Sequence, residues 1–197
     1  AAAGLLKMVA LQQEPSMGPI VVTGSTGGVG SMAVAILAKA GFEVIAVTGK
    51  TNAEEYLKHL GASRIEPRSF VEDLSGKALL KQNWAGAIDT VGGSTLSVLL
   101  KGCGNDGTVV STGLVQSYAL TSTVYPFILN GVNLVGVGSA GTKAEQRKVI
   151  WNMLDEEWNI KDKLAAIVKE VPLEELVTDH IETILEGKNM GRVIVKI

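Results

Sequence analysis

The feature that most constrains this chain is a glycine-rich turn at residues 23–30, which reads Thr-Gly-Ser-Thr-Gly-Gly-Val-Gly. A β-branched run at 20–22 precedes it, and a stretch rich in small residues at 31–40 follows it. This order predicts a strand, a tight turn and the start of a helix. Glycines let the backbone approach a ligand closely, and the free N–H groups and dipole of a helix start favour a negative group. The motif therefore predicts a pyrophosphate site.

The strand–helix pattern continues along the chain and predicts the fold class. We expect strands at 19–23, 43–48, 63–66, 86–89, 107–111 and 132–137, and helices at 28–40, 52–60, 70–81, 94–101, 123–129 and 142–157. Such alternation is typical of an α/β fold with a Rossmann-type, doubly wound parallel sheet, here of six strands. The ligand should lie at the carboxyl ends of the strands, beside the first strand.

Composition excludes several classes of function. Hydrophobic residues make up 46% of the 197 residues, but no apolar run reaches the roughly 18–20 residues that a membrane span needs. The net charge of −2 and the dispersed basic residues argue against a nucleic-acid surface. The single cysteine, Cys103, excludes an intrachain disulfide and, with only two histidines, leaves no zinc cluster. Together with the lack of a signal peptide, this predicts a cytoplasmic protein.

The residues after the second expected strand indicate which dinucleotide is bound. An NAD site needs an acidic residue about 20 positions beyond the glycines, to accept a hydrogen bond from the ribose 2′-OH. Here the strand ends in Thr48, Gly49 and Lys50, and the nearby acid, Glu43, lies at its other end. A hydroxyl, a backbone N–H and an ammonium suit a 2′-phosphate, which Arg68 could also reach. We therefore predict NADP(H) as the cofactor.

Two further features concern catalysis. A short-chain dehydrogenase would carry a Tyr-x-x-x-Lys pair, but none of the three tyrosines, Tyr56, Tyr118 and Tyr125, has a lysine four positions later. Asp89, at the end of the fourth expected strand, precedes two glycines at 92–93, a pattern that indicates a turn organiser more than a catalytic acid.

The chain resembles the nucleotide-binding half of medium-chain dehydrogenase/reductases, in particular the zinc-free quinone oxidoreductase branch and its acrylyl-CoA reductase-like group. The segments that carry this resemblance are 21–30, 55–63, 84–93, 123–129 and 191–197. The glycine motif is widely shared, whereas the segments around Trp84 and Tyr125 and the carboxyl terminus are more specific.

The resemblance implies a two-domain enzyme whose N-terminal GroES-like barrel is missing from this chain. Residues 1–12 then resemble a connecting helix, 13–163 the NADP-binding Rossmann domain, and 164–197 a strand–helix–strand return segment that would pack on the barrel. In this segment we expect a strand at 167–168, a helix at 173–185 and a strand at 193–197, and the two strands have no place in the six-stranded sheet. We infer a truncated chain, inactive on its own, with a complete single-domain relative as the alternative. No catalytic or metal-binding residue is assigned, since the catalytic candidates would lie in the barrel.

The family further implies hydride transfer from NADPH to an α,β-unsaturated acyl-CoA, such as acrylyl-CoA, or to a quinone-like acceptor. Thr26, Gly27, Gly28 and Val29 would hold the pyrophosphate; Thr48, Gly49, Lys50 and Arg68 the adenosine phosphate; and Leu114, Ile128 and Ser139 the nicotinamide end. Gly138 and Gly187 depart from the Asp and Asn that relatives tend to carry.

Two expectations concern partners. Family members often form dimers through their sixth strands, and residues 132–137 are apolar and lack the charges or proline that usually protect a sheet edge. A homodimer through this strand is therefore expected. The alternative to an enzyme is a stand-alone NADP(H) sensor or assembly module without turnover, which would need the same phosphate site.

Overall fold

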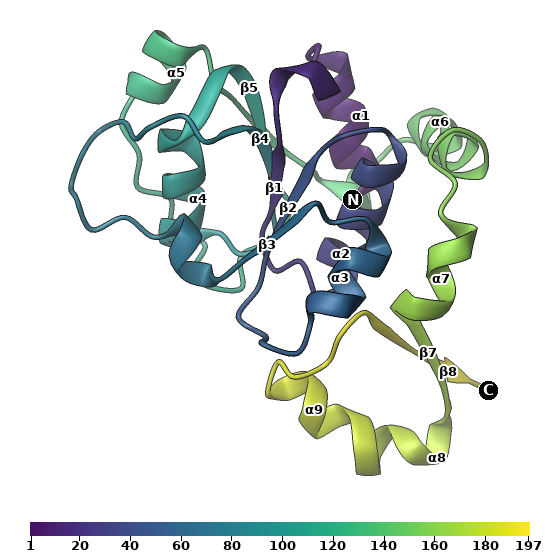
Figure 1. Ribbon diagram of the computed structural model, residues 1–197. Coiled ribbons are helices and arrows are strands. Elements are labelled where there is room, and N and C mark those ends of the chain that lie inside the picture. The colour runs from purple at the N-terminus through teal and green to yellow at the C-terminus, as the bar shows by residue number, and fades with distance from the viewer.

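The computed structural model describes residues 1–197 and every side chain except that of Thr178. Its centre is a six-stranded parallel sheet in the order β3-β2-β1-β4-β5-β6 (Figure 1). The strands are β1 (Ile20–Val22), β2 (Val44–Val47), β3 (Arg64–Glu66), β4 (Trp84–Asp89), β5 (Cys103–Ser111) and β6 (Asn133–Gly136). The predicted Rossmann-type doubly wound sheet is confirmed. The switch point lies beside β1, because the chain runs outward from β1 through β2 to β3 and then crosses to β4 on the other side of β1.

Helices cover both faces of the sheet. They are α1 (Ala2–Ala10), α2 (Gly28–Lys39), α3 (Glu54–Leu60), α4 (Gly93–Lys101), α5 (Tyr125–Asn130), α6 (Ala144–Asp155) and α7 (Lys161–Ile167). Figure 1 shows α4 and α5 on one face and α1, α2, α3 and α6 on the other. Successive residues of a strand face opposite sides, so Ile20 and Val22 pack with Met8 and Ile36, whereas Val21 packs with Leu99 in a second core. This explains why the central strands read as unbroken apolar runs.

The prediction of a helix at 70–81 is wrong. The structure has a short 3₁₀ helix, η2 (Arg68–Val71), followed by an irregular loop up to β4. The Asp73 carboxylate accepts hydrogen bonds from the backbone N–H and the hydroxyl of Ser75, at 2.9 and 2.6 Å, and Gly76 has a φ of +69°. This side-chain turn competes with helical hydrogen bonds and stops the helix after one turn.

The C-terminal segment differs from expectation in detail. Helix α7, which the sequence analysis missed, ends at Ile167, and the strand expected at 167–168 is β7 (Val168–Pro172). The helix expected over 173–185 is divided into α8 (Leu173–Glu175), a π-helical turn (Leu176–His180) and α9 (Ile181–Leu185). As expected, the last strands stay outside the main sheet: among the described strands, β7 pairs in parallel only with β8 (Arg192–Lys196).

Within the described part of the chain, no helix is both long and apolar enough to cross a membrane.

Candidate functional site

The glycine turn joins β1 to α2 in the tight form that its sequence predicts. Gly24 has a φ of +55°, a left-handed conformation that glycine adopts without strain. A Cβ atom on Gly30 would collide with the Gly24 carbonyl oxygen, so only glycine lets the first turn of α2 pack this closely. The N-terminal end of α2 therefore lies directly against the turn, where its free N–H groups can face an anion.

Asp89 supports this turn from behind. Its carboxylate is fully buried and accepts hydrogen bonds from the Thr23 hydroxyl at 2.6 Å, Val91 N at 3.1 Å and Gly92 N at 2.8 Å. Burial raises the pKa of the Asp89 carboxyl, and these three donors oppose that rise. All its contacts are structural, in line with the interpretation of Asp89 as a turn organiser.

The end of β2 meets the glycine turn through side chains. Thr26 Oγ1 lies 3.5 Å from Thr48 Oγ1, and the Lys50 ammonium donates a hydrogen bond to Thr26 Oγ1 at 3.1 Å. Thr26 and Thr48 are buried, and Thr48 Oγ1 accepts a further bond from Lys50 N at 3.1 Å. The structure thus brings the residues predicted to bind the pyrophosphate, 26–29, and those predicted to bind the adenosine phosphate, 48–50, into one cluster.

Arg68 completes the adenosine side of this cluster. A Cβ atom on Gly49 would lie 2.6 Å from Arg68 Nε, so the guanidinium lies over the backbone of that glycine. Partial burial lowers the pKa of Lys50, and the charge of Arg68 adds to that effect. Two cations held this close without a carboxylate repel each other, and a bound anion would relieve that repulsion.

The C-terminal segment contributes residues that the sequence analysis missed. Gly191 N donates a hydrogen bond to the Thr26 carbonyl at 2.9 Å, and the Lys50 ammonium donates to the Asn189 carbonyl at 3.1 Å. The Arg192 side chain fills the space that a Cβ on Gly28 would take. The glycine at 191 and the arginine after it are visible in the sequence, but nothing local to them indicates that they return to a turn so far away along the chain.

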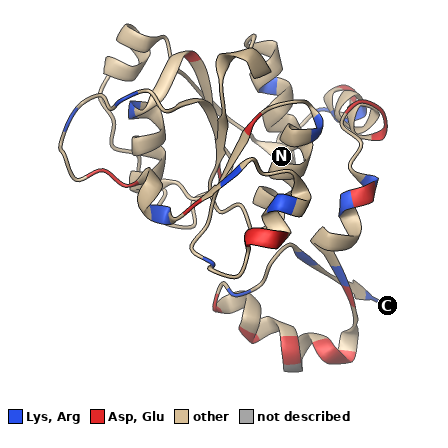
Figure 2. Ribbon diagram, in the orientation of Figure 1, with Lys and Arg blue, Asp and Glu red and all other residues tan. Residues whose placement is uncertain are grey.

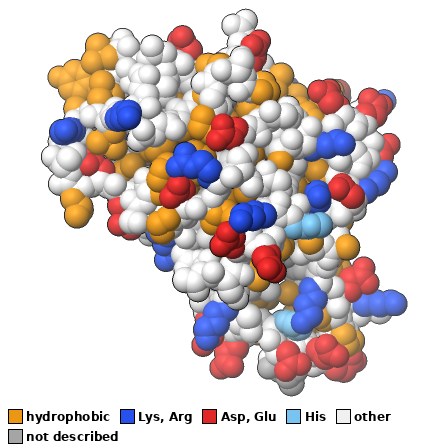
Figure 3. Space-filling view, in the orientation of Figure 1, with side chains coloured by type: hydrophobic (Ala, Val, Ile, Leu, Met, Phe, Trp, Pro, Cys, Tyr) orange, Lys and Arg blue, Asp and Glu red, His pale blue; other side chains and the backbone are white. Residues whose placement is uncertain are grey.

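The charge balance of the cluster is one-sided. Lys50, Arg68 and Arg192 form no ion pair with a carboxylate among the described residues, whereas nearby Arg64 pairs with Glu66 at 2.6 Å. Most acidic residues of the C-terminal segment lie instead between the start of α8 and the end of α9 (Figure 2). In the space-filling view, basic and acidic side chains are interspersed over the face of the molecule (Figure 3). Three unpaired cations around a glycine turn fit a ligand that carries several phosphate charges.

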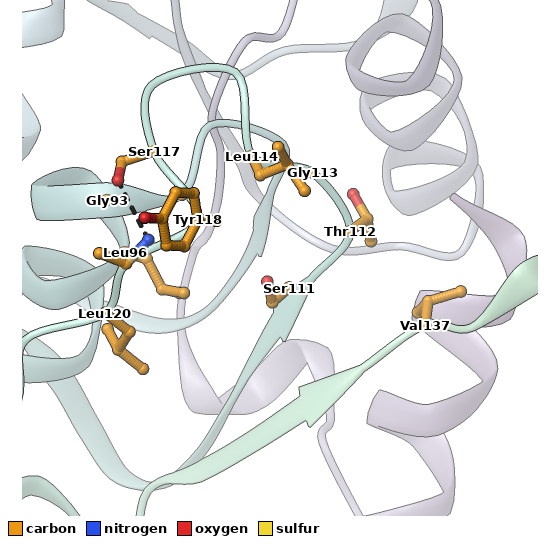
Figure 4. A pocket seen from close by; sticks show the side chains of 12 residues that line it. Gly93, Leu96, Ser111, Thr112, Gly113, Leu114, Ser117, Tyr118, Leu120 and Val137 are labelled. Carbon is orange, nitrogen blue, oxygen red and sulfur yellow. Dashed lines mark hydrogen bonds between the residues drawn. The ribbon is translucent and has the colours of Figure 1, made fainter.

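The expected nicotinamide end is less complete. Leu114 lines a cavity of about 240 Å³ beyond the carboxyl ends of β5 and β6, together with Ser111, Thr112 and Val137 (Figure 4). Ile128, on α5, and Ser139, in a 3₁₀ turn after β6, do not line it. The structure therefore brings together the phosphate residues but not the three nicotinamide residues.

A second cavity of about 460 Å³ adjoins the first and shares Gly93, Ser117 and Ala119 with it. It includes the ion pair between Lys101 Nζ and Asp73 Oδ2, at 3.0 Å. Hydrogen bonds from Ser75, followed by one from Lys101, lower the pKa of Asp73 to about 2. Its cation is already paired, so this cavity is a weaker anion site than the glycine turn. Among the described residues, no group of three or more His, Cys, Asp or Glu side chains could hold a metal ion.

Comparison with known proteins bears on this geometry. The profile of the zinc-binding dehydrogenase family matches residues 28–156. YhfP of Bacillus subtilis (strain 168), named provisionally as a quinone oxidoreductase, is 42% identical over 183 residues, which is 93% of this chain and 55% of that protein.

The chain belongs to the zinc-binding dehydrogenase family.

The predicted resemblance to medium-chain dehydrogenase/reductases is thereby confirmed. The acrylyl-CoA reductase AcuI of Ruegeria pomeroyi is 37% identical over 196 residues, which is 98% of this chain and 59% of that enzyme. The chain thus spans between half and two thirds of the length of these curated relatives.

Solved structures show the same fold with a dinucleotide bound. B. subtilis YhfP with NAD bound superposes with a TM-score of 0.94 at 41% identity, covering all of this chain and 59% of that one. The YhdH oxidoreductase of Salmonella enterica in complex with NADP superposes with a TM-score of 0.93 at 38% identity, again over all of this chain and 59% of that one. Both dinucleotides thus occur among close structural neighbours, so the choice between them depends on this chain's own residues.

Proposed function

We propose that this chain is the NADPH-binding part of an oxidoreductase that transfers hydride to an α,β-unsaturated acyl-CoA or to a quinone-like acceptor. The observation that carries the proposal is the cluster at the glycine turn, where Lys50, Arg68 and Arg192 form no ion pair among the described residues. No acidic residue follows β2 to bind a ribose 2′-OH, and a cation stands there instead.

Each part of the cluster has a distinct role in this proposal. The backbone of residues 26–29, at the start of α2, holds the pyrophosphate, and Arg192, at the start of β8, neutralises its charge. Thr48, Gly49, Lys50 and Arg68 hold the adenosine 2′-phosphate. When bound, the reduced nicotinamide supplies the hydride.

The nicotinamide end is assigned more loosely. We place the nicotinamide ring near Leu114, with Ile128 and Ser139 as further contacts, on the evidence of family resemblance. The cavity at Leu114 supports the first of these positions. In this proposal the present chain positions the cofactor, and we assign it no catalytic residue.

The acceptor is proposed from relatives alone. The names of the similar proteins include an acrylyl-CoA reductase and a quinone oxidoreductase, both small-molecule enzymes. Zinc-independent chemistry, a cytoplasmic location, and the division into residues 1–12, 13–163 and 164–197 remain predictions. Cys103 is free and buried, which is compatible with a reducing compartment.

The test separates the two phosphate subsites by substitution. We expect R68Q to weaken NADPH binding by about tenfold or more and to leave NADH nearly unchanged, because Arg68 faces only the 2′-phosphate. R192Q should weaken both cofactors by similar factors, because both carry the pyrophosphate. Isothermal titration calorimetry of each variant measures these affinities.

The matched control is R64Q. Arg64 lies on β3, just before Arg68 in the chain, and is already paired with Glu66. It should alter neither affinity. Equal losses of NADPH and NADH in R68Q would contradict the assignment of a 2′-phosphate site.

A further inference from the structure

Tyr56 makes a partly buried contact that the cofactor assignment does not use. It lies in the first turn of α3, and its hydroxyl donates a hydrogen bond to Ser31 Oγ, in the first turns of α2, at 2.7 Å. Burial raises the pKa of the Tyr56 phenol, while the bond to Ser31 opposes this rise. The phenol therefore keeps its proton at neutral pH and acts as a donor.

Ser31 passes this contact on to the glycine turn. Its side chain is fully buried, and its hydroxyl donates to the Ser25 carbonyl at 3.3 Å. Ser25 is also held from the other side, because its N–H and its hydroxyl both donate to the Val47 carbonyl, at 3.2 and 2.9 Å. The carbonyl of the Ser25–Thr26 peptide is thus held by α2, and the N–H and hydroxyl of Ser25 are held by the end of β2.

The same two elements carry the predicted phosphate contacts. Thr26, which directly follows this peptide, accepts a hydrogen bond from Lys50. The loop from 49 to 53, which contains Lys50, runs straight into α3, where Tyr56 is anchored. The bond from Tyr56 to Ser31 therefore ties the α3 end of this loop to the start of α2, while the bonds from Ser25 to the Val47 carbonyl tie its β2 end to the glycine turn.

We propose that Tyr56 is a positioning residue that, through Ser31, holds the 2′-phosphate loop in register with the glycine turn and so strengthens the selection of 2′-phosphorylated cofactors. This inference rests on the proposed function, since it assumes that Lys50 and Arg68 bind a 2′-phosphate. Tyr56 itself touches no ligand in this account. It acts on the alignment of Thr26 and Lys50.

The experiment measures the adenosine end alone. Adenosine 2′,5′-bisphosphate and adenosine 5′-monophosphate are titrated by calorimetry into the wild type and into Y56F, S31A and the double variant. We expect Y56F and S31A each to weaken the bisphosphate by about fivefold, which corresponds to one lost hydrogen bond, with little change for the monophosphate. The double variant should be no worse than the single ones, because both substitutions break the same connection.

The control is Y118F, since Tyr118 is 91% exposed and belongs to another loop. It should change neither affinity. If Y56F lowers the melting temperature and weakens both ligands by the same factor, Tyr56 is merely structural and the proposal is overturned. Additive losses in the double variant would also overturn it.

A measurement without ligand separates this inference from the proposed function. If the wild type binds neither nucleotide, the proposed function fails, and amide hydrogen exchange of the free protein then decides the positioning role. The connection predicts faster exchange in Y56F than in wild type at residues 25–26 and 48–53, with Y118F unchanged. Equal exchange in all three proteins would overturn it.

Discussion

The two ends of the expected cofactor site differ in how completely this chain builds them. At the glycine turn, residues of the turn itself, of the loop after β2 and of the C-terminal segment bond to one another, and Thr26 and Thr48 are buried. At the nicotinamide end, Leu114 and Ile128 are 66% and 67% exposed, and Ser139 is also exposed. Hydrophobic side chains gather on the surface over α5 (Figure 3).

This difference separates cofactor choice from reaction chemistry. The phosphate end is held together by local turns and by the parallel sheet, so it can form within this chain. The nicotinamide end has apolar side chains without a cover, and such surfaces are usually buried against a partner or another part of a protein. We therefore expect this chain to determine which dinucleotide binds, and its surroundings to determine what is reduced.

The largest effect should come from breaking the phosphate end. In G30A, the new Cβ would collide with the Gly24 carbonyl oxygen and push α2 away from the turn. We expect about a hundredfold weaker binding of both NADPH and NADH, measured by calorimetry, because overpacking of a rigid turn displaces the anion site. The matched control is G141A, where the added Cβ meets open space. Unchanged binding in G30A would show that the turn is not the pyrophosphate site.

The second prediction concerns pairing of two chains through strand β6. Strand β6 forms an edge of the sheet and pairs only with β5 among the described strands. We propose that two chains pair through β6, which would double the mass measured by light scattering and slow amide exchange at residues 133–136. A monomer at high micromolar concentration would contradict this proposal. The substitution L134K would be a poor test, because Leu134 packs against the core on the α4 and α5 face.

A smaller effect should appear in the pH dependence of cofactor preference. Burial, together with the charge of Arg68, lowers the pKa of Lys50, and only its protonated form attracts a 2′-phosphate. The ratio of NADPH to NADH affinity should therefore fall as the pH rises from 7 towards 10. It should also fall below about pH 6, where the phosphate takes up a proton.

Stability should respond in the opposite sense. The folded free protein releases the Lys50 proton at a lower pH than the unfolded chain does, so the Lys50 contribution to stability improves as pH rises through the lowered pKa. For the pH dependence of cofactor preference, the control is K50Q. Its ratio of NADPH to NADH affinity should stay constant between pH 7 and 10. A wild-type ratio that is equally flat would argue against a role for the Lys50 charge.

The sequence predicts the central fold well because its signals are local. The apolar strands and the glycine turn each carry their own pattern, and all six sheet strands are confirmed with shifts at their ends. The failed helix at 70–81 shows the limit of such patterns, since a single carboxylate at Asp73 redirects the backbone. The π-helical turn at Leu176–His180 likewise has no clear sequence signal.

The residues of the candidate site also divide into those that local sequence signals predict and those that they do not. Thr26, Thr48 and Lys50 could be found from their positions just after β1 and β2, because the carboxyl ends of adjacent parallel strands lie at the same edge of the sheet. Asn189 and Arg192 could not, since the bond from Lys50 to Asn189 joins residues 139 positions apart and depends on how the C-terminal segment folds back. Ile128 and Ser139 follow from the resemblance alone, and neither lines the cavity that Leu114 lines.

The measurement that tests the central claim most directly is a calorimetric titration of the unmodified chain with NADPH and, separately, with NADH. The account predicts that NADPH binds at least about tenfold more tightly, a difference of about 1.4 kcal/mol. Equal affinities, or a preference for NADH, would contradict the claim that Lys50 and Arg68 form a 2′-phosphate site.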